Sequence, residues 1–280
     1  MPDAGPGSAD PDPKQLEAIA VAVAGEAAAL IRASVGTAKR IGEKSSPTDI
    51  VTRTDLEAED LIRRLLAEAT PHASVLGEES GHTPTRVGQI PAPLQWVVDP
   101  LDGTVNFLYS LPVMAVSVAA AFAGDVVAGA IVDVLRAETF SGAAGCGARR
   151  DGMPLAISDC RALAEALVLT GFSYHSNLRD RQGQIVHSLL PAARDIRCFG
   201  SAALQLCWVG AGRADAYFER DIKVWDYAAG ALIAREAGAV IELPCPENEG
   251  LAIAATPGIF DELRSLVDHP WMSPNADARR

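Results

Sequence analysis

Two carboxylates three positions apart follow an apolar run in residues 96–104, WVVDPLDGT. An apolar strand that runs into Asp99 and Asp102 puts charge next to a buried element, where an unpaired charge is costly. Because Pro100 cannot donate a ladder hydrogen bond, we expect the chain to turn there, so that both carboxylates and the Leu101 carbonyl converge. Oxygen ligands of this kind suit a hard cation such as Mg²⁺. An arbitrary DxxD is more often a turn with two solvated acids, and the preceding strand shifts the balance toward a site.

The next two residues extend this chemistry to an anion. Gly103 and Thr104 stand at a predicted helix start, where free backbone N–H groups can hold a phosphate. Hydrolysis of a phosphomonoester needs an activated nucleophile, neutralised phosphate oxygens and a stabilised leaving alkoxide, which bound metal ions can supply. A Thr104 hydroxyl that relays to Asp55 could accept the proton of an attacking water. No Ser-His-Asp or Cys-His arrangement stands out, so the pattern requires no covalent intermediate.

The segment GEES at residues 77–80 has the same arrangement of a short apolar strand that ends in acids. By strand periodicity, one of Glu78 and Glu79 points inward and the other outward. A metal ligand and a solvated loop start are both open interpretations of Glu78.

Further candidate acids have a simpler structural explanation as well. Asp226 in WDYAAG and Asp55 stand at helix starts, where Asp commonly serves as an N-cap. Glu219 ends a predicted strand, so it could be a solvated charge. Residues 200–202, GSA, could be a glycine turn followed by a serine N-cap. The pattern alone favours these simpler interpretations.

Hydrophobic periodicity predicts the elements that must position these groups. Gly124-Asp125 favours a hairpin between two of the predicted strands. The predicted helices cover residues 14–34, 55–69, 201–211, 226–236 and 257–267, and the predicted strands 75–76, 94–98, 113–122, 126–134 and 215–219. Two helices, an antiparallel sheet and then alternating strands and helices indicate a layered sandwich in two halves.

Composition limits the class of protein. The 280 residues include 36 Asp and Glu against 24 Lys and Arg, a formal net charge of −12. This balance disfavours general binding to nucleic acid or to an anionic membrane. With 49% hydrophobic and 21% charged residues the chain can bury a full core. Its apolar stretches are interrupted well before the ~18–20 residues that a membrane span needs.

The ends of the chain and its cysteines complete this picture. Residues 1–13 are acidic and rich in Pro and Gly and are predicted to be a disordered tail, unlike a secretory signal. We expect an N-terminal α+β half over 14–155 and a C-terminal α/β half over 156–280. Five cysteines, without CxxC spacing, indicate reduced and mostly buried residues of a cytoplasmic protein.

Four segments together resemble the inositol monophosphatase family, part of the magnesium-dependent, lithium-sensitive sugar-phosphatase superfamily. They are KSSPTDIVTRTD at 44–55, GEES at 77–80, DPLDGTVNF at 99–107 and WDYAAG at 225–230. The resemblance runs from about residue 14 to 267. It implies the layered αβαβα sandwich of the sugar phosphatases, of mixed α+β and α/β character.

By its motifs, the resemblance implies two to three Mg²⁺ ions per site. Glu78, Asp99 and the Leu101 carbonyl would hold the first ion. Asp99, Asp102 and Asp226 would hold the second, and Glu78 with waters a weaker third.

The resemblance also assigns the catalytic and substrate contacts. Asp55 and Thr104 would orient the attacking water, and Lys44 would lie near the metal cluster and the phosphate. One departure is Asp221, at a position where relatives often have Gly. The residues expected to contact substrate are Asp102, Gly103, Thr104, Gly200, Ser201, Ala202 and Glu219.

The activity implied is Mg²⁺-dependent hydrolysis of inositol 1-phosphate by direct attack of water. Because the motifs hold phosphate and metal but not the leaving group, other small phosphomonoesters remain open: histidinol phosphate, fructose 1,6-bisphosphate, 3′-phosphoadenosine 5′-phosphate and NADP. A regulatory binding protein on the same fold is the alternative from another class. A homodimer is the family expectation, with no direct contact to nucleic acid or membrane.

Overall fold

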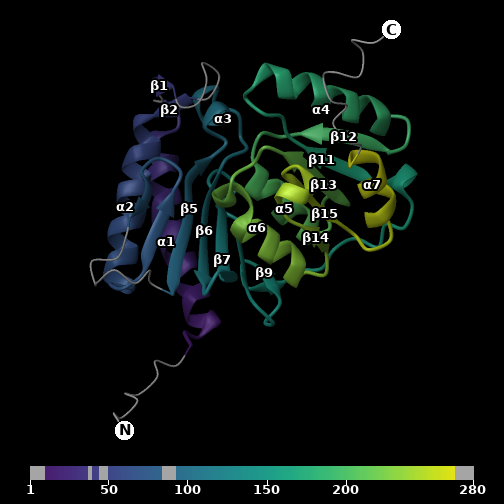
Figure 1. Ribbon diagram of the computed structural model, residues 1–280. Helices are drawn as coiled ribbons and strands as arrows, with labels where there is room; N and C mark the ends of the chain where they lie inside the picture. The colour runs from purple at the N-terminus through teal and green to yellow at the C-terminus, as the bar shows by residue number, and fades with distance from the viewer. Residues whose placement is uncertain (1–9, 37–39, 44–49, 84–92, 269–280) are drawn as a thin grey trace.

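The computed structural model describes residues 10–36, 40–43, 50–83 and 93–268 (Figure 1). Its helices are α1 (Pro13–Ser34), α2 (Arg53–Ala69), α3 (Thr104–Leu108), α4 (Ser176–Leu189), α5 (Ala202–Gly210), α6 (Val224–Glu236) and α7 (Phe260–Val267), with short 3₁₀ turns at Leu163–Glu165 and Pro246–Asn248. Its strands are β1 (Arg40–Glu43), β2 (Ile50–Thr52), β3 (Ser74–Gly77), β4 (Gly81–Thr83), β5 (Leu94–Asp102), β6 (Ala115–Phe122), β7 (Asp125–Asp133), β8 (Thr139–Ala143), β9 (Ala148–Arg150), β10 (Met153–Pro154), β11 (Leu167–Thr170), β12 (Asp195–Cys198), β13 (Ala216–Arg220), β14 (Val240–Glu242) and β15 (Leu251–Ala255).

Five layers of secondary structure stack on one another. Helices α1 and α2 cover one face of an eight-stranded sheet, and α5 and α6 fill the space between this sheet and a five-stranded one. Helices α4 and α7 cover the outer face of the second sheet (Figure 1). The predicted αβαβα sandwich is therefore confirmed. Among the described helices, none combines the length and the apolar character needed to cross a membrane.

Small residues let the middle helices lie close to the first sheet. A Cβ atom added at Gly129 of β7 would stand 3.0 Å from the Cβ of Ala229 in α6. Ala228, Ala229 and Ile233 of the same helix are buried in the central hydrophobic cluster. This close packing fixes the start of α6, and with it Asp226, relative to the sheet.

Strand β5 lies inside the first sheet and differs from its predicted course. It pairs in parallel with β3 and antiparallel with β6, and its ladder continues to Asp102. Asp99 is opposite Ser117 and Asp102 is opposite Ala115, so the register shifts between them. The expected turn at Pro100 is wrong, because a β-bulge accommodates the proline while the strand goes on.

The second sheet has the strand order β12-β11-β13-β15-β14. Side chains of β13 alternate between its two faces. Tyr217 belongs to the cluster shared with α5 and α6, whereas Ala216 and Phe218 belong to the cluster beneath α4 and α7. Glu219 follows the Tyr217 face and Arg220 the other.

Local signals worked well at several element ends. The Lys14 N–H donates to Oδ1 of Asp12 at 3.0 Å, which confirms the predicted cap of α1. The hairpin between β6 and β7 turns at Ala123-Gly124, one residue earlier than predicted, because Phe122 pairs with Asp125. The β1–β2 hairpin was not predicted. The boundary between two halves near residue 155 stays a prediction.

The expectation of mostly buried cysteines is wrong. Cys207 is buried, Cys146 and Cys160 are half-buried, and Cys198 and Cys245 are exposed. All five are free thiols.

Candidate active site

The end of β5 carries the first two acids of the site. Asp99 is only 2% exposed, and its Oδ1 accepts a hydrogen bond from the Leu101 N–H at 2.9 Å. Oδ2 of Asp102 accepts from the Ser201 hydroxyl at 2.6 Å and from the Ala203 N–H at 2.7 Å. The bulge thus brings Asp102 to the N-terminal end of α5, where the helix dipole favours a negative charge.

Asp55 and Thr104 form a direct pair. Thr104 Oγ1 lies 2.9 Å from Oδ1 of Asp55 and 3.1 Å from the Leu101 carbonyl, so its one proton has two possible acceptors. The other oxygen of Asp55 accepts from the amide of Thr52 at 3.0 Å and from the Thr52 hydroxyl. Asp55 is fully buried. Asp55 therefore stabilises the N-terminus of α2, which was the simpler of its two interpretations, and it also contacts Thr104.

Gly103 makes the transition from β5 to α3. It has φ of 96°, and an added Cβ would stand 2.9 Å from the Val113 carbonyl oxygen and 3.2 Å from that of Gly200. Only glycine combines this backbone shape with such a close approach. The amide of Asn106 then donates to the carbonyls of Val113 at 2.8 Å and Phe199 at 2.7 Å, which ties residues 199–201 to the same corner.

Glu78 enters from the neighbouring strand. Because β3 runs parallel to β5, with Gly77 opposite Val98, Glu78 follows β3 at the level of Asp99 in β5. The Glu78 N–H donates to the Val98 carbonyl at 3.3 Å. Glu78 and Asp99 therefore leave adjacent strands at the same edge of the sheet.

Asp226 begins α6, and its Oδ2 accepts from the Lys223 N–H at 2.6 Å. It is thus a helix-start acid, as the sequence allowed. Burial raises the pKa of Asp226 well above its ordinary value, and the negative charges of Glu78 and Asp102 add to the rise. Burial also raises the pKa of Asp102 to about 6, with a further contribution from Glu78, despite the bonds from Ser201 and Ala203 that lower it.

These shared effects show that three acids from distant parts of the chain repel one another electrostatically. Glu78 follows β3, Asp102 ends β5 and Asp226 lies in the first turn of α6. Across residues 10–36, 40–43, 50–83 and 93–268, however, no group of three or more His, Cys, Asp or Glu side chains is arranged to hold a metal ion as it stands. The acids are close enough to interact electrostatically, but their side chains are not oriented as a complete set of metal ligands.

Glu219 faces the same region from the second sheet. Burial raises its pKa to about 8, and the charges of Asp102 and Asp221 contribute, while the bond from Tyr217 lowers it. The Tyr217 hydroxyl donates to Oε2 of Glu219 at 2.9 Å. A Cβ at Gly171 would stand 2.1 Å from this carboxylate, so only glycine leaves Glu219 its position.

Asp221 adopts φ of 72°, which explains how it replaces the expected glycine. Its carboxylate accepts from the Ser173 hydroxyl at 2.6 Å and from Lys223 Nζ at 3.2 Å. Burial alone would raise its pKa, but these two bonds outweigh it and the pKa is lowered. Asp221 is consequently a negative charge at neutral pH, already balanced by its own neighbour.

Among the predicted site residues, Asp55 contacts Thr104 and Asp102 contacts Ser201, and two of these residues need comment. Lys44 lies outside the residues that the structure describes. The Ser201 hydroxyl, predicted to contact substrate, is used by Asp102 and also accepts from the Leu204 N–H at 3.3 Å. Sequence reasoning missed Asn106 and Tyr217, whose polar atoms hold site segments without belonging to an acidic motif.

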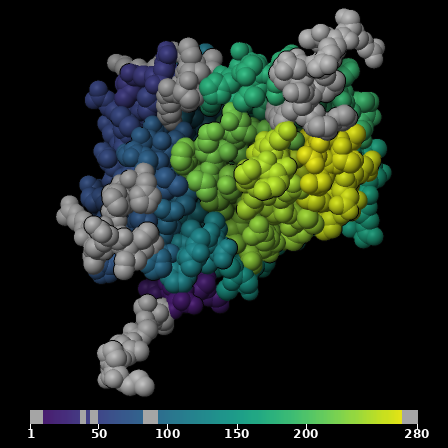
Figure 2. Space-filling view, viewed as in Figure 1, coloured from purple at the N-terminus to yellow at the C-terminus, as the bar shows by residue number. Residues whose placement is uncertain are grey.

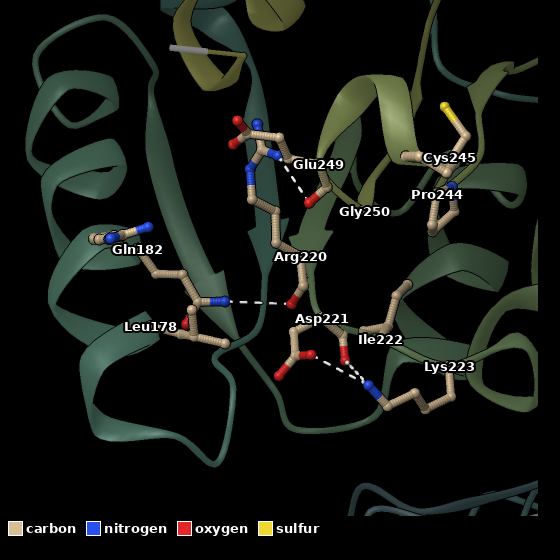
Figure 3. Close-up of a pocket in the computed structure, with 12 residues that line it drawn as sticks. Leu178, Gln182, Arg220, Asp221, Ile222, Lys223, Pro244, Cys245, Glu249 and Gly250 are labelled. Atoms are coloured by element: carbon tan, nitrogen blue, oxygen red, sulfur yellow. Dashed lines mark hydrogen bonds and ion pairs between the residues drawn. The ribbon is translucent and has the colours of Figure 1, made fainter. Parts of the chain in front are cut away.

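A cavity of about 500 Å³ adjoins the site without being part of it (Figure 3). Arg220 lines it, as do Leu178 and Gln182 of α4. Since Arg220 and Glu219 point to opposite faces of β13, the cavity opens on the α4 side and the acids gather on the α5 side. Figure 2 shows the early segments of the chain, in blue, beside later segments in green, whereas the yellow segments lie at the opposite edge of the view.

Comparison with known proteins agrees with this geometry. The sequence profile of the inositol monophosphatase family matches residues 12–268. The chain is 46% identical to inositol-1-monophosphatase of Mycobacterium leprae, over 92% of this chain and 95% of that protein. It is 38% identical to the Nus factor SuhB of Pasteurella multocida, over 79% and 84%.

Solved structures show the same fold. The structure of Mycobacterium tuberculosis SuhB superposes with a TM-score of 0.77 at 40% identity, covering 92% of this chain and 97% of the other. The inositol monophosphatase of Anabaena gives a TM-score of 0.76 at 30% identity, covering 91% and 95%. The matched acids, the glycine turn before α3 and the layered sandwich belong together: this chain is a member of the inositol monophosphatase family.

Proposed function

We propose that this protein is a Mg²⁺-dependent phosphatase that hydrolyses inositol 1-phosphate to inositol and phosphate. One observation carries the proposal: Glu78 raises the pKa of both Asp102 and Asp226, although the three acids come from separate elements. Such a convergence of like charges is costly unless a cation neutralises it. The choice of inositol 1-phosphate as the substrate follows from the relatives that are named inositol-1-monophosphatase.

The residues present fit a hard divalent cation. We assign Glu78, Asp99, the Leu101 carbonyl, Asp102 and Asp226 as its ligands, two or three ions in all. Carboxylate and carbonyl oxygens without sulfur or imidazole are the donors that Mg²⁺ prefers. When bound, the metal would supply charge neutralisation at the phosphate and a more acidic water.

Thr104 and Asp55 would handle the proton of the attacking water. Thr104 Oγ1 can accept a hydrogen bond from water while it donates to Oδ1 of Asp55, 2.9 Å away. As the water attacks, its proton passes to Oγ1 and the threonine proton passes to Oδ1. Oδ2 is held by Thr52, which keeps Oδ1 directed at Thr104. Lys44 would act nearby, on the phosphate side.

Two further groups would bind the substrate. The backbone N–H groups of Gly103 and Thr104 would bind the phosphate oxygens, and Asp102 would contact the substrate beside them. On the sugar side, residues 200–202 and Glu219 would contact the hydroxyl groups. Since Tyr217 donates to Oε2, Oε1 is the oxygen of Glu219 left to meet a polyol.

The direct test is a metal-dependent substrate panel with purified full-length protein. We expect phosphate release from inositol 1-phosphate with Mg²⁺, loss of it with a chelator, and inhibition by lithium. Comparing kcat/KM for inositol 1-phosphate, histidinol phosphate, fructose 1,6-bisphosphate, 3′-phosphoadenosine 5′-phosphate and NADP ranks the possible substrates. Metal-loaded protein that is inert on the whole panel would refute the proposal.

A regulatory binding role is the second candidate, because relatives at 38% identity are named Nus factor. The acids that match the family motifs are all present among the described residues, as is Thr104, and this favours a catalytic role. A pull-down with Asp99→Asn protein separates the roles, since a partner bound independently of catalysis stays bound. We also propose a cytoplasmic homodimer, which size-exclusion chromatography with light scattering tests for oligomeric state.

A further inference from the structure

A buried carboxylate beneath the GEES turn belongs to none of the motifs. Glu59 lies in α2 and is 1% exposed. Its Oε2 accepts from the Glu79 N–H at 2.8 Å and its Oε1 from the Ser80 N–H at 3.0 Å. The helix thus holds two consecutive backbone amides of a turn 20 residues further along the chain.

Arg63, one helical turn after Glu59, holds the other side of the same turn. Its Nε lies 2.8 Å from Oε1 of Glu59, and its guanidinium donates to the carbonyls of Gly81 at 2.7 Å and Val75 at 3.3 Å. Carboxylate and guanidinium therefore contact the strand before the turn, the turn itself and the residue after it. Such charge-assisted bonds are stronger and more directional than neutral ones.

The side chains of Glu59 and Arg63, in these positions, leave no room for a side chain at residue 77. A Cβ added at Gly77 would stand 2.6 Å from Cδ of Glu59 and 2.7 Å from Nη2 of Arg63. The residue that follows Gly77 is Glu78, whose own N–H is fixed on the Val98 carbonyl. The N–H groups of Glu78, Glu79 and Ser80 are thus each held by a defined partner.

We propose that Glu59 is a positioning residue for Glu78: by holding the Glu79 and Ser80 amides, it directs the Glu78 carboxylate at Asp102 and Asp226. The proposal rests on the proposed function, in which Glu78 is a metal ligand. Glu59 itself touches neither metal nor substrate. Because the Glu78 N–H is held on the Val98 carbonyl, the turn begins next to the part of β5 that carries Asp99 and Asp102.

Chemistry explains why a carboxylate is needed at position 59. Two N–H groups and one guanidinium donate to its two oxygens, so both terminal atoms of the side chain at position 59 must be hydrogen-bond acceptors. Glutamine in the same volume would present one N–H₂ group to these donors and lose the charge that pairs with Arg63. The turn would then loosen while the helix, whose core face is Ala58, Ile62 and Leu66, keeps its packing.

The test compares Glu59→Gln with Glu68→Gln, an exposed position on the same helix. Hydrogen exchange of metal-free protein reports the amides of residues 78–81, and calorimetric titration with Mg²⁺ reports the affinity. We expect faster exchange at these amides and a Kd for Mg²⁺ roughly 10- to 100-fold higher, the usual effect of removing a group that orients a ligand. Glu68→Gln should change neither.

A second variant guards against an unpaired guanidinium as the cause. Glu59→Gln with Arg63→Met removes both charges, and it should still bind Mg²⁺ weakly if the turn is what matters. Affinity within twofold of the original in both Glu59 variants overturns the proposal. Failure of the unaltered protein to bind Mg²⁺ would instead remove the proposed function, and with it the proposal.

Discussion

The Ser201 hydroxyl lies 2.6 Å from Oδ2 of Asp102, and this bond joins the residue before α5 to the last residue of β5. The two residues are 99 positions apart and belong to different layers. The bond makes Ser201 a residue that orients an acid as well as one close to the predicted substrate. It also ties the eight-stranded sheet to the middle layer of helices at the site.

Replacing Ser201 by alanine should weaken both roles of Asp102. The bond from Ser201 lowers the pKa of Asp102, so its loss raises that pKa further above about 6. We expect Mg²⁺ affinity to fall roughly 10- to 100-fold and the acid limb of the pH–rate profile to move to higher pH. Activity against pH at several Mg²⁺ concentrations checks this. Ser188→Ala, at an exposed position, is the control, and an unshifted profile in Ser201→Ala would contradict the assignment.

Removal of the Thr104 hydroxyl should act on turnover. Thr104→Ala takes away the group that lies 2.9 Å from Asp55, so we expect kcat to fall about 10²- to 10⁴-fold with a small change in KM. Thr104→Ser keeps the hydroxyl and should retain most of the activity. Steady-state kinetics at saturating Mg²⁺ makes the comparison. Equal losses in the two variants would show that the methyl group, not the proton path, matters.

Stability of the metal-free protein should fall as pH rises. Asp102 has its pKa raised from 3.8 to about 6 and Glu219 from 4.5 to about 8, so the folded state binds protons more tightly than the unfolded state. This stability is complete below about pH 4 and is lost as pH rises through about 6 and then about 8. We expect a total loss on the order of a few kcal/mol.

Denaturant unfolding between pH 5 and 9, with chelator and with Mg²⁺, measures this effect as approximate differences in unfolding free energy. Mg²⁺ should remove the part of the slope that comes from Asp102, which is assigned as a ligand, and leave the part that comes from Glu219. Glu219→Gln should flatten the upper part of the curve in chelator. A metal-free protein that gains stability across this range would contradict the described electrostatics.

Gly103 offers a test of close backbone approach. Gly103→Ala combines φ of 96° with a Cβ only 2.9 Å from the Val113 carbonyl. We expect a destabilisation of about 1–3 kcal/mol or more and a large loss of activity. Gly152→Ala, at φ of 79° with open space around it, separates backbone strain from the clash. Thermal unfolding of both variants makes the comparison. Similar Tm values would show that the close approach of the Val113 carbonyl adds nothing to the backbone strain.

Much of this fold could be predicted because its elements follow local rules. Helix α1 has a cap, a first-turn proline and apolar periodicity, and β6 and β7 are long apolar runs around a glycine turn. Strands β1 and β2 have only 4 and 3 residues, which is too short to show a period. The continuation of β5 past Pro100 depends on a bulge against β6, which only the pairing partner defines.

The site residues also separate into those that the sequence predicts and those that it does not. Its acids could be predicted because they end strands or begin helices, positions that a sequence marks. Glu59 could not, since an acid on an amphipathic helix gives the same pattern whether it is solvated or buried. Its role depends on a turn that the helix meets only after folding. The same holds for Tyr217, an aromatic core residue until its hydroxyl is seen to contact Glu219.

The order in which the acids occur along the chain has a consequence for biosynthesis. The eight-stranded sheet is complete at Pro154, whereas Asp226 belongs to α6, far downstream. On the ribosome, a nascent chain can therefore assemble its first sheet, with Asp99 and Asp102 in place, while the last acid has yet to be translated. Such an intermediate lacks one of the charges that make the site attractive to a cation. The proposed metal site is therefore complete only after α6 has been translated and has packed against the first sheet.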